Sequence, residues 1–163
     1  MIGIKSVKID GESIYVFNGA IYIFASSLGY TLQLDIIVSE VVVKRYQGEN
    51  HLIVEIELED GRIISSIMHL KALPGGLPQL NLFCDIEDPE EYPDLHIVNE
   101  SDSVFPDIEA GITLAEIRKM EMPNEKITLK LNLPIDQVEW LKSKKTKDLN
   151  AFFEELLNQH LTK

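Results

Sequence analysis

The chain has 163 residues, and 45% of them are hydrophobic, which is typical of a folded domain and not of a disordered chain. Its 27 acidic and 15 basic side chains give a formal net charge of −12, which favours basic partners and argues against DNA binding by the whole surface. One cysteine, Cys84, excludes a disulfide framework and a multi-cysteine zinc site. No signal-peptide core and no apolar run long enough for a membrane helix is present, so we expect a cytoplasmic protein.

The first 70 residues have the pattern of strands joined by turns. The segments "SIYVF" and "AIYIF" flank Asn18-Gly19, a pair that suits both positive-φ positions of a type I′ turn, so we predict a hairpin there. The β-branched run "TLQLDIIVSEVVVKRY" is predicted to be a long strand. In "HLIVEIELE" apolar and mostly acidic residues alternate, which predicts a half-exposed strand. Asp60-Gly61 is then expected to turn the chain into the strand "RIISSIMHL".

The next 50 residues combine two short strands with acidic loops and one helix. The pattern predicts a strand at "QLNLFCDI" and loops around a short strand, "LHIV", within the proline- and acid-rich stretch 85–109. Thr113 and Glu116 have the spacing of a capping box, which predicts a short helix near 113–120.

Two motifs in this part carry a family resemblance. "IELEDGRIISSIMHL" and "SVFPDIEAGITLAEI" resemble the signatures of a family of small uncharacterised bacterial domains. That family has a strand–Asp-Gly-Arg–strand hairpin and a Trp-Pro-Asp-like turn that leads into a short helix. Phe105 stands here where the tryptophan is usual, and Glu109 is what remains of an acidic pair. The resemblance implies a β-rich architecture and no particular activity.

The last 38 residues have the pattern of a strand followed by two helices. Alternate residues from Ile127 to Leu133 are apolar, which predicts a strand that Pro134 ends. "PIDQVEWLKS" and "LNAFFEELLNQHL" show apolar residues at helical spacing, and "KKTKD" is a polar connection between them. The predicted fold is therefore α+β, with a mainly antiparallel, acidic β-rich domain over 1–121 and a strand–helix–helix unit over 126–163.

Positive charge is concentrated in this second unit. Residues 1–123 hold 21 acidic and 8 basic residues, whereas residues 124–163 hold 6 and 7. A unit of about 40 residues cannot bury enough apolar surface to be stable alone. Its apolar faces therefore need either the β domain or a second copy of the same unit as a partner.

The second option resembles the ribbon–helix–helix family of DNA-binding proteins. In that family, strands from two chains pair antiparallel in the major groove, and the amino end of the second helix binds phosphate. The resemblance implies a homodimer in which outward side chains contact bases and lysines near the second helix contact phosphates. The implied base-facing residues are Thr128, Lys130 and Asn132, and the implied phosphate contacts are Lys144, Lys145 and Lys147. The distance from Pro134 to the second helix is about one helical turn shorter than is usual in the family, and the turn lacks the glycine often found there.

No pattern in the sequence predicts a catalytic site, a cofactor or a metal site. The acidic stretch 85–94 lacks the ligand spacing and central glycine of a calcium loop. Cys84 lies in an apolar strand, where a small core residue is the usual role. The four histidines have no paired helical spacing and are expected to have surface roles: His51, His69, His96 and His160.

Three functional hypotheses remain open. The first is a non-enzymatic, antitoxin-like transcription regulator that dimerises and binds DNA through 126–163, while its acidic β domain binds a basic protein. The second is a protein-interaction or structural module without DNA binding, in which the two helices serve as dimer contacts or cover the sheet. The third is an enzyme whose site the sequence does not reveal.

Overall fold

A computed structural model describes residues 2–71, 76–102 and 104–162 of the chain. The chain divides into two compact units, Met1–Asn124 and Glu125–Lys163. The first is a β domain, and the second contains two helices. The α+β class predicted from the sequence is confirmed.

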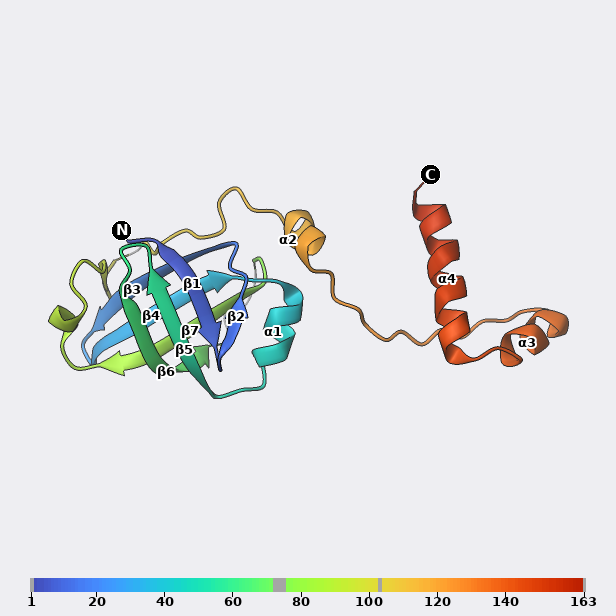
Figure 1. The fold of residues 1–163 in the computed structure, drawn as a ribbon, viewed down its shortest axis with the longest axis horizontal. Helices are drawn as coiled ribbons and strands as arrows, with labels where there is room; N and C mark the ends of the chain where they lie inside the picture. The colour runs from blue at the N-terminus through green and yellow to red at the C-terminus, as the bar shows by residue number, and fades with distance from the viewer. Residues whose placement is uncertain (1, 72–75, 103, 163) are drawn as a thin grey trace. The chain divides into compact units, whose positions relative to one another are not determined.

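The β domain is built on one eight-stranded sheet (Figure 1). The order across the sheet is β2-β1-β5-β6-β7-β4-β3-β8, and all described neighbours are antiparallel except β3 and β8. The strands are β1 Ile4–Ile9, β2 Glu12–Ile14, β3 Asn18–Ser26, β4 Gly29–Ile37, β5 His51–Leu58, β6 Ile63–Lys71, β7 Gln79–Ile86 and β8 Ile97–Asn99. Three further elements belong to the domain: helix α1 Glu40–Tyr46, the short 3-10 turn Pro89–Glu91 and helix α2 Leu114–Met120.

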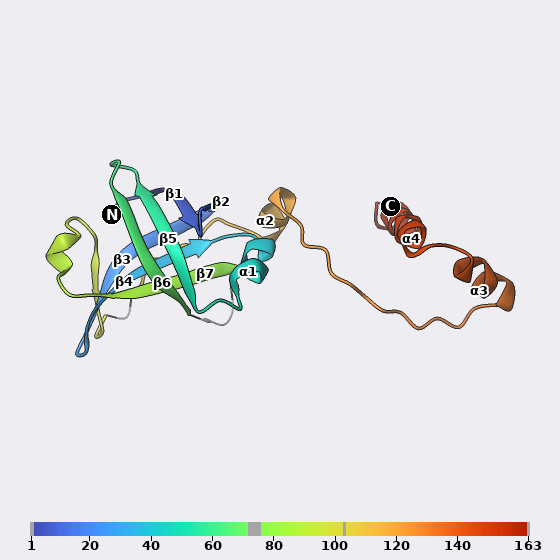
Figure 2. The same cartoon turned by 60° about the horizontal axis from the view of Figure 1, so that its bottom comes forward.

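The sheet curls back on itself, so that β1, β5 and β6 lie across from β3 and β4 (Figures 1 and 2). The inner face is filled by one apolar cluster with members from all of these strands, including Ile9, Ile23, Leu34 and Ile56, which are fully buried. The alternation predicted for 51–59 is confirmed, because the even-numbered residues of β5 face this cluster while Ile53 and its odd-numbered neighbours face outward.

The hairpin predicted at Asn18-Gly19 is wrong. Both residues lie inside β3, paired with Ile37 and Ile36 of β4, and neither has a positive φ. Gly19 is needed for close packing instead, because a Cβ there would come within 2.8 Å of the Ile36 side chain. The positive-φ pair is Asp10-Gly11, with φ of 49° and 83°, and it joins β1 to β2 as a two-residue turn.

The strand predicted over 31–46 is half right. Its first part is β4, but its second part is the helix α1. Ser39 caps the helix by accepting a hydrogen bond from the Val42 N–H, and acidic and basic residues lie in the first and last turns. These end signals and the burial of Val42 and Tyr46 on one face outweigh the β propensity of the three valines.

The outer face of β3 is covered by the segment from β8 to α2. Val98, Ile108 and Ile117 pack with Tyr22 in a second apolar cluster, and Phe105 lies against the Tyr22 ring at 6.4 Å between centroids. The predicted capping box of α2 is confirmed: Thr113 and Glu116 each accept from the other's backbone N–H. This segment is thus a fixed part of the β domain.

The C-terminal unit contains helices α3 Ile135–Lys142 and α4 Thr146–Leu161. Residues 125–134 form no strand in the single chain, and they donate no backbone hydrogen bond. The strand predicted at 126–133 therefore has no partner within one chain.

Candidate functional site

The three residues predicted to face bases lie in the extended segment before α3. Thr128, Lys130 and Asn132 are all exposed. Ile127, Leu129 and Leu131, which alternate with them, are also exposed, by 80%, 63% and 58%. One set of alternating residues is thus polar and the other apolar, and neither is covered within the single chain.

The three lysines predicted to contact phosphate lie at the junction of the two helices. Lys144 and Lys145 are in the connection, and all three lysines are exposed. Lys147 is in the first turn of α4 and not in the connection before it, because the helix begins at Thr146. The Lys144 ammonium lies 5.2 Å from the centre of the Trp140 ring, a cation–π contact that keeps this charge near the junction.

The amino end of α4 lacks a side-chain cap. Its N-cap residue is Lys145, which makes no capping hydrogen bond. The first-turn N–H groups have no partner within a helix and carry the positive end of the helix dipole, so they can bind an anion. Asp148 is the acidic residue of this first turn, and its negative charge opposes the binding of an anion at the helix end.

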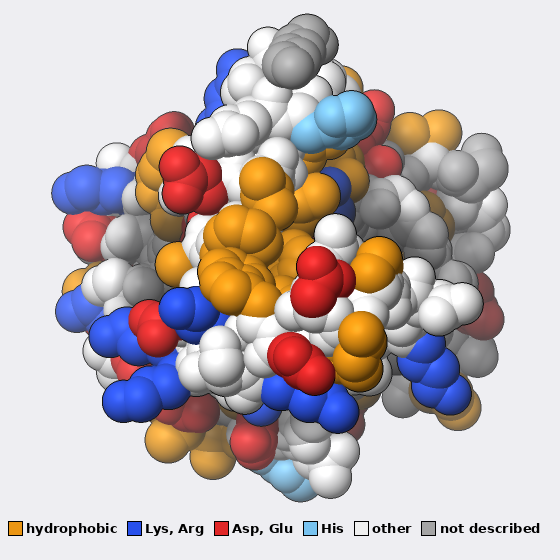
Figure 3. Space-filling model, turned by 90° about the vertical axis from the view of Figure 1, so that its right-hand side faces the viewer, with side chains coloured by type: hydrophobic (Ala, Val, Ile, Leu, Met, Phe, Trp, Pro, Cys, Tyr) orange, Lys and Arg blue, Asp and Glu red, His pale blue; other side chains and the backbone are white. Residues whose placement is uncertain are grey.

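The apolar residues of the C-terminal unit are exposed or half-buried over residues 125–162. No side chain in residues 125–162 is buried. Figure 3, which faces this unit, shows hydrophobic side chains gathered in a central patch. The exposed members on α4 are Phe152, Phe153, Leu156, Leu157 and Leu161.

An apolar groove runs between the extended segment and the two helices. It has a volume of about 290 Å³ and is lined by Leu131, Leu133, Gln137, Trp140, Leu141, Phe152 and Phe153. Trp140 and Phe152 meet edge to face with ring centroids 5.2 Å apart, and this contact holds α3 against α4. The groove is therefore formed by residues that the unit brings together itself, and it is open to an apolar partner.

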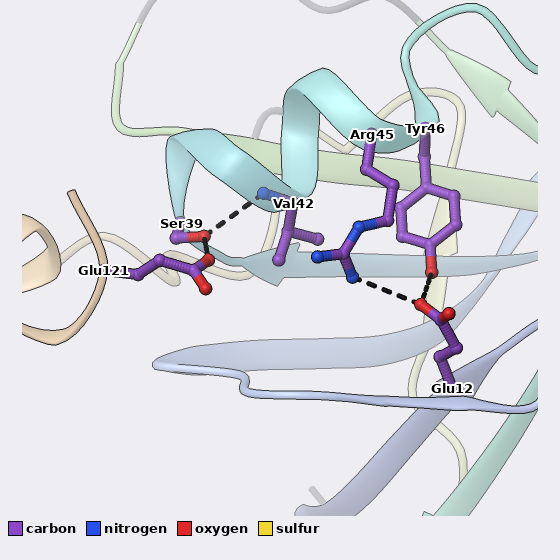
Figure 4. Close-up of polar contacts among 6 residues, drawn as sticks. All are labelled: Glu12, Ser39, Val42, Arg45, Tyr46 and Glu121. Carbon is purple, nitrogen blue, oxygen red and sulfur yellow. Dashed lines mark hydrogen bonds and ion pairs between the residues drawn. The ribbon is translucent and has the colours of Figure 1, made fainter. Parts of the chain in front are cut away.

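A second cluster of polar contacts surrounds α1 in the β domain (Figure 4). The Ser39 hydroxyl donates to the Glu121 carboxylate just beyond α2. Arg118 on α2 forms two hydrogen bonds with Glu40, at 2.6 and 3.1 Å, and these hold the pKa of Glu40 below its ordinary value. These contacts fix the end of α2 to the start of α1.

At the other end of α1, Arg45 and Tyr46 both contact Glu12 of β2, at 3.3 and 3.4 Å (Figure 4). Burial raises the pKa of the Tyr46 hydroxyl, and the bond to Arg45 acts in the opposite direction. A shallow pocket of about 310 Å³ lies between these contacts and Glu121. Of the groups that line it, Ser39 and Glu121 pair with each other and Arg45 pairs with Glu12, and these paired groups form no assembled nucleophile and base.

The outer face of β4 and β7 carries a chain of partly buried polar groups. Asp35 accepts from the Tyr22 hydroxyl at 2.8 Å and from the Asn81 amide at 2.9 Å. Burial, and then the charge of Asp35, raise the pKa of Tyr22 far above its usual range. Glu109 accepts from the Leu77 N–H and the Gln79 amide. These bonds satisfy the groups they join and attach the segment around Glu109 to the sheet.

The remaining candidates for chemistry lack partners. Cys84 is 7% exposed and belongs to the inner core, as predicted, and burial raises the pKa of its thiol. Among the described residues, no group of three or more His, Cys, Asp or Glu side chains is placed to hold a metal ion. No helix in the described part of the chain is both long and apolar enough to cross a membrane.

The sequence did not reveal the contacts around α1 or a pair of facing histidines, His51 and His69, on β5 and β6. Both depend on the pairing of distant segments, and the only local signal was the capping serine, Ser39.

Comparison with known proteins finds no matching family model, no matching curated protein and no matching solved structure.

Proposed function

We propose that this chain is a dimeric DNA-binding transcription regulator of the antitoxin type. Residues 125–163 form the dimer and contact DNA, and the acidic β domain binds a basic protein. The observation that carries the proposal is the C-terminal unit itself, which has two amphipathic helices and an apolar segment but no buried side chain within 125–162.

A second copy supplies what this unit lacks. Domains of this size usually need oligomerisation to bury enough apolar surface. Antiparallel pairing of 127–133 with its symmetry copy would satisfy the backbone groups that have no partner in the single chain. Because side chains alternate along a strand, the pairing would place Ile127, Leu129 and Leu131 over the helices. An isologous dimer of this kind has the same patch on both subunits.

The opposite face of such a ribbon has residue types that suit base recognition. Asn132 can pair bidentately with adenine, and Lys130 can donate to guanine. The lysines at the start of α4 would neutralise phosphates, next to the uncapped helix end. The unit is the least acidic part of the chain, and this supports it as the DNA-binding part.

The β domain is left for a different partner, because DNA repels it. Residues 1–123 have 13 more acidic than basic side chains. Six of the acidic residues lie in one stretch that begins near the end of β7 and continues beyond it, and all are exposed: Asp85, Glu87, Asp88, Glu90, Glu91 and Asp94. A basic protein surface is the complementary partner, since opposite potentials steer association.

A DNA titration tests the proposal. The unmodified chain is titrated with its own upstream fragment and with a scrambled duplex at several salt concentrations. Replacing Lys144, Lys145 and Lys147 with alanine should weaken binding to both duplexes alike and reduce the salt slope by up to about 2.7, at about 0.9 per phosphate contact. The Asn132→Ala variant should instead lose about 1–3 kcal/mol on the preferred sequence only.

The matched control removes three exposed lysines of the β domain: Lys8, Lys44 and Lys119. This variant has the same change in net charge and should bind DNA as the unmodified chain does. Equal losses in both triple variants would show a charge effect and not a site. Absence of binding at low salt, in a chain that still dimerises, would leave the C-terminal unit as a dimer contact alone, as in the interaction-module hypothesis.

A further inference from the structure

Two histidines that are far apart in the sequence face each other on the outer surface of the β domain. His51 begins β5 and is directly opposite His69 of β6 in the antiparallel ladder. Their ring centroids are 4.7 Å apart, and the ring planes meet at 64°. His51 is exposed and His69 is half-buried, so the pair is open to solvent.

This centroid separation is compatible with two imidazoles that share one metal ion. When both rings direct a nitrogen at the ion, metal–nitrogen bonds of ~2.0–2.1 Å at angles between square-planar and tetrahedral place the two imidazole centroids ~4.5–5.2 Å apart. The observed separation falls inside that range without any movement of the backbone. Imidazole nitrogen is a preferred ligand of zinc, copper and nickel, and not of magnesium or calcium.

The surroundings leave the ring nitrogens available. Neither imidazole has a hydrogen-bond partner among the described residues. The His69 ring lies tilted against Phe83 of β7 at 5.4 Å between centroids, which restricts its rotation. Lys71, two residues after His69 in β6, is held over Phe83 and hydrogen-bonded to Gln33 at 3.3 Å. The acidic domain also raises the local concentration of cations.

From this geometry we propose that His51 and His69 form a binding site for one divalent transition-metal ion, Zn²⁺ or Ni²⁺. The two strands supply two ligands, and water fills the other positions. The site depends only on the fold of the β domain and is independent of the proposed DNA binding. The sequence predicted no metal site, because no helical spacing or loop motif places these two residues together.

The test is calorimetric titration of the full chain, without a histidine tag, with Zn²⁺, Ni²⁺ and Mg²⁺. We expect one Zn²⁺ or Ni²⁺ per chain and no Mg²⁺ binding. Either His51→Gln or His69→Gln should abolish the one-to-one binding, whereas the control variants His96→Gln and His160→Gln should retain it. Far-UV circular dichroism and a thermal melt establish that each variant is folded.

A second measurement uses the unmodified protein and does not depend on variants. Diethyl pyrocarbonate modifies accessible imidazoles, and mass spectrometry locates the products. Added Zn²⁺ should protect His51 and His69 while His96 and His160 stay reactive. Equal modification of all four with and without metal, no binding at millimolar Zn²⁺, or binding that survives both substitutions would overturn the proposal and leave an aromatic contact only.

Discussion

Leu157 on α4 provides a quantitative test of dimerisation. In the single chain 58% of its surface is exposed, so a polar replacement costs an isolated chain little. Full burial of a leucine contributes about 1.5–3 kcal/mol, so covering its exposed part contributes about 1–2 kcal/mol. A twofold dimer doubles this to about 2–4 kcal/mol. Glutamine preserves helix propensity, so Leu157→Gln should raise the dimer dissociation constant by about 30- to 700-fold.

Sedimentation equilibrium over a range of concentrations measures this change. The matched control is Leu28→Gln, because Leu28 is 98% exposed in the turn between β3 and β4 and lies in the other unit. The control should dimerise as the unmodified chain does. The reasoning is refuted if the unmodified chain is monomeric at high micromolar concentration, or if both leucine variants have the same dissociation constant.

Three further predictions concern the β domain. Ile117→Ala should lower the free energy of unfolding by about 2–5 kcal/mol, because Ile117 is fully buried in the second apolar cluster. Denaturant unfolding should show no comparable loss for the control Met120→Ala, since Met120 is 58% exposed. Gly19→Ala should lower the free energy of unfolding by about 1–3 kcal/mol through overpacking, because the alanine Cβ would lie 2.8 Å from Ile36 Cγ2. A thermal melt should show this loss and no change for the control Gly48→Ala, since a Cβ at Gly48 meets no atom within 4 Å. Arg118 lowers the pKa of Glu40 below its ordinary 4.5. The pair therefore stabilises the fold above pH 4.5, and this contribution is lost as the pH falls below that value. Urea unfolding at several pH values should show a flatter dependence of stability on pH in this range for Glu40→Gln.

Local patterns predicted much of the fold. The alternation in β5, the Asp60-Gly61 turn and the capping box of α2 each depend on a few neighbouring residues, and all three are present. The predictions were wrong where tertiary contacts determine the local conformation. Asn18-Gly19 has turn chemistry, but its position beside Ile36 demands a residue without a side chain in a strand. The valines before Tyr46 have β propensity, but a capping serine and a one-sided buried face make them helical.

The two candidate sites differ in whether the sequence alone could predict them. The lysines and the alternating segment of the C-terminal unit are contiguous in the sequence, so their pattern could be read directly. His51 and His69 meet only because β5 and β6 pair in one register, and a slip by one residue would place them on opposite faces. No local signal fixes that register before the whole sheet is known.

Hydrogen exchange of the backbone amides in residues 127–133 tests the central claim most directly. In the single chain these amides have no hydrogen-bond partner, so they should exchange rapidly in dilute solution. If two chains pair through this segment, alternate amides should become protected as the protein concentration rises through the dimer dissociation constant. Rapid exchange at every concentration, or protection that does not depend on concentration, would contradict pairing between two chains.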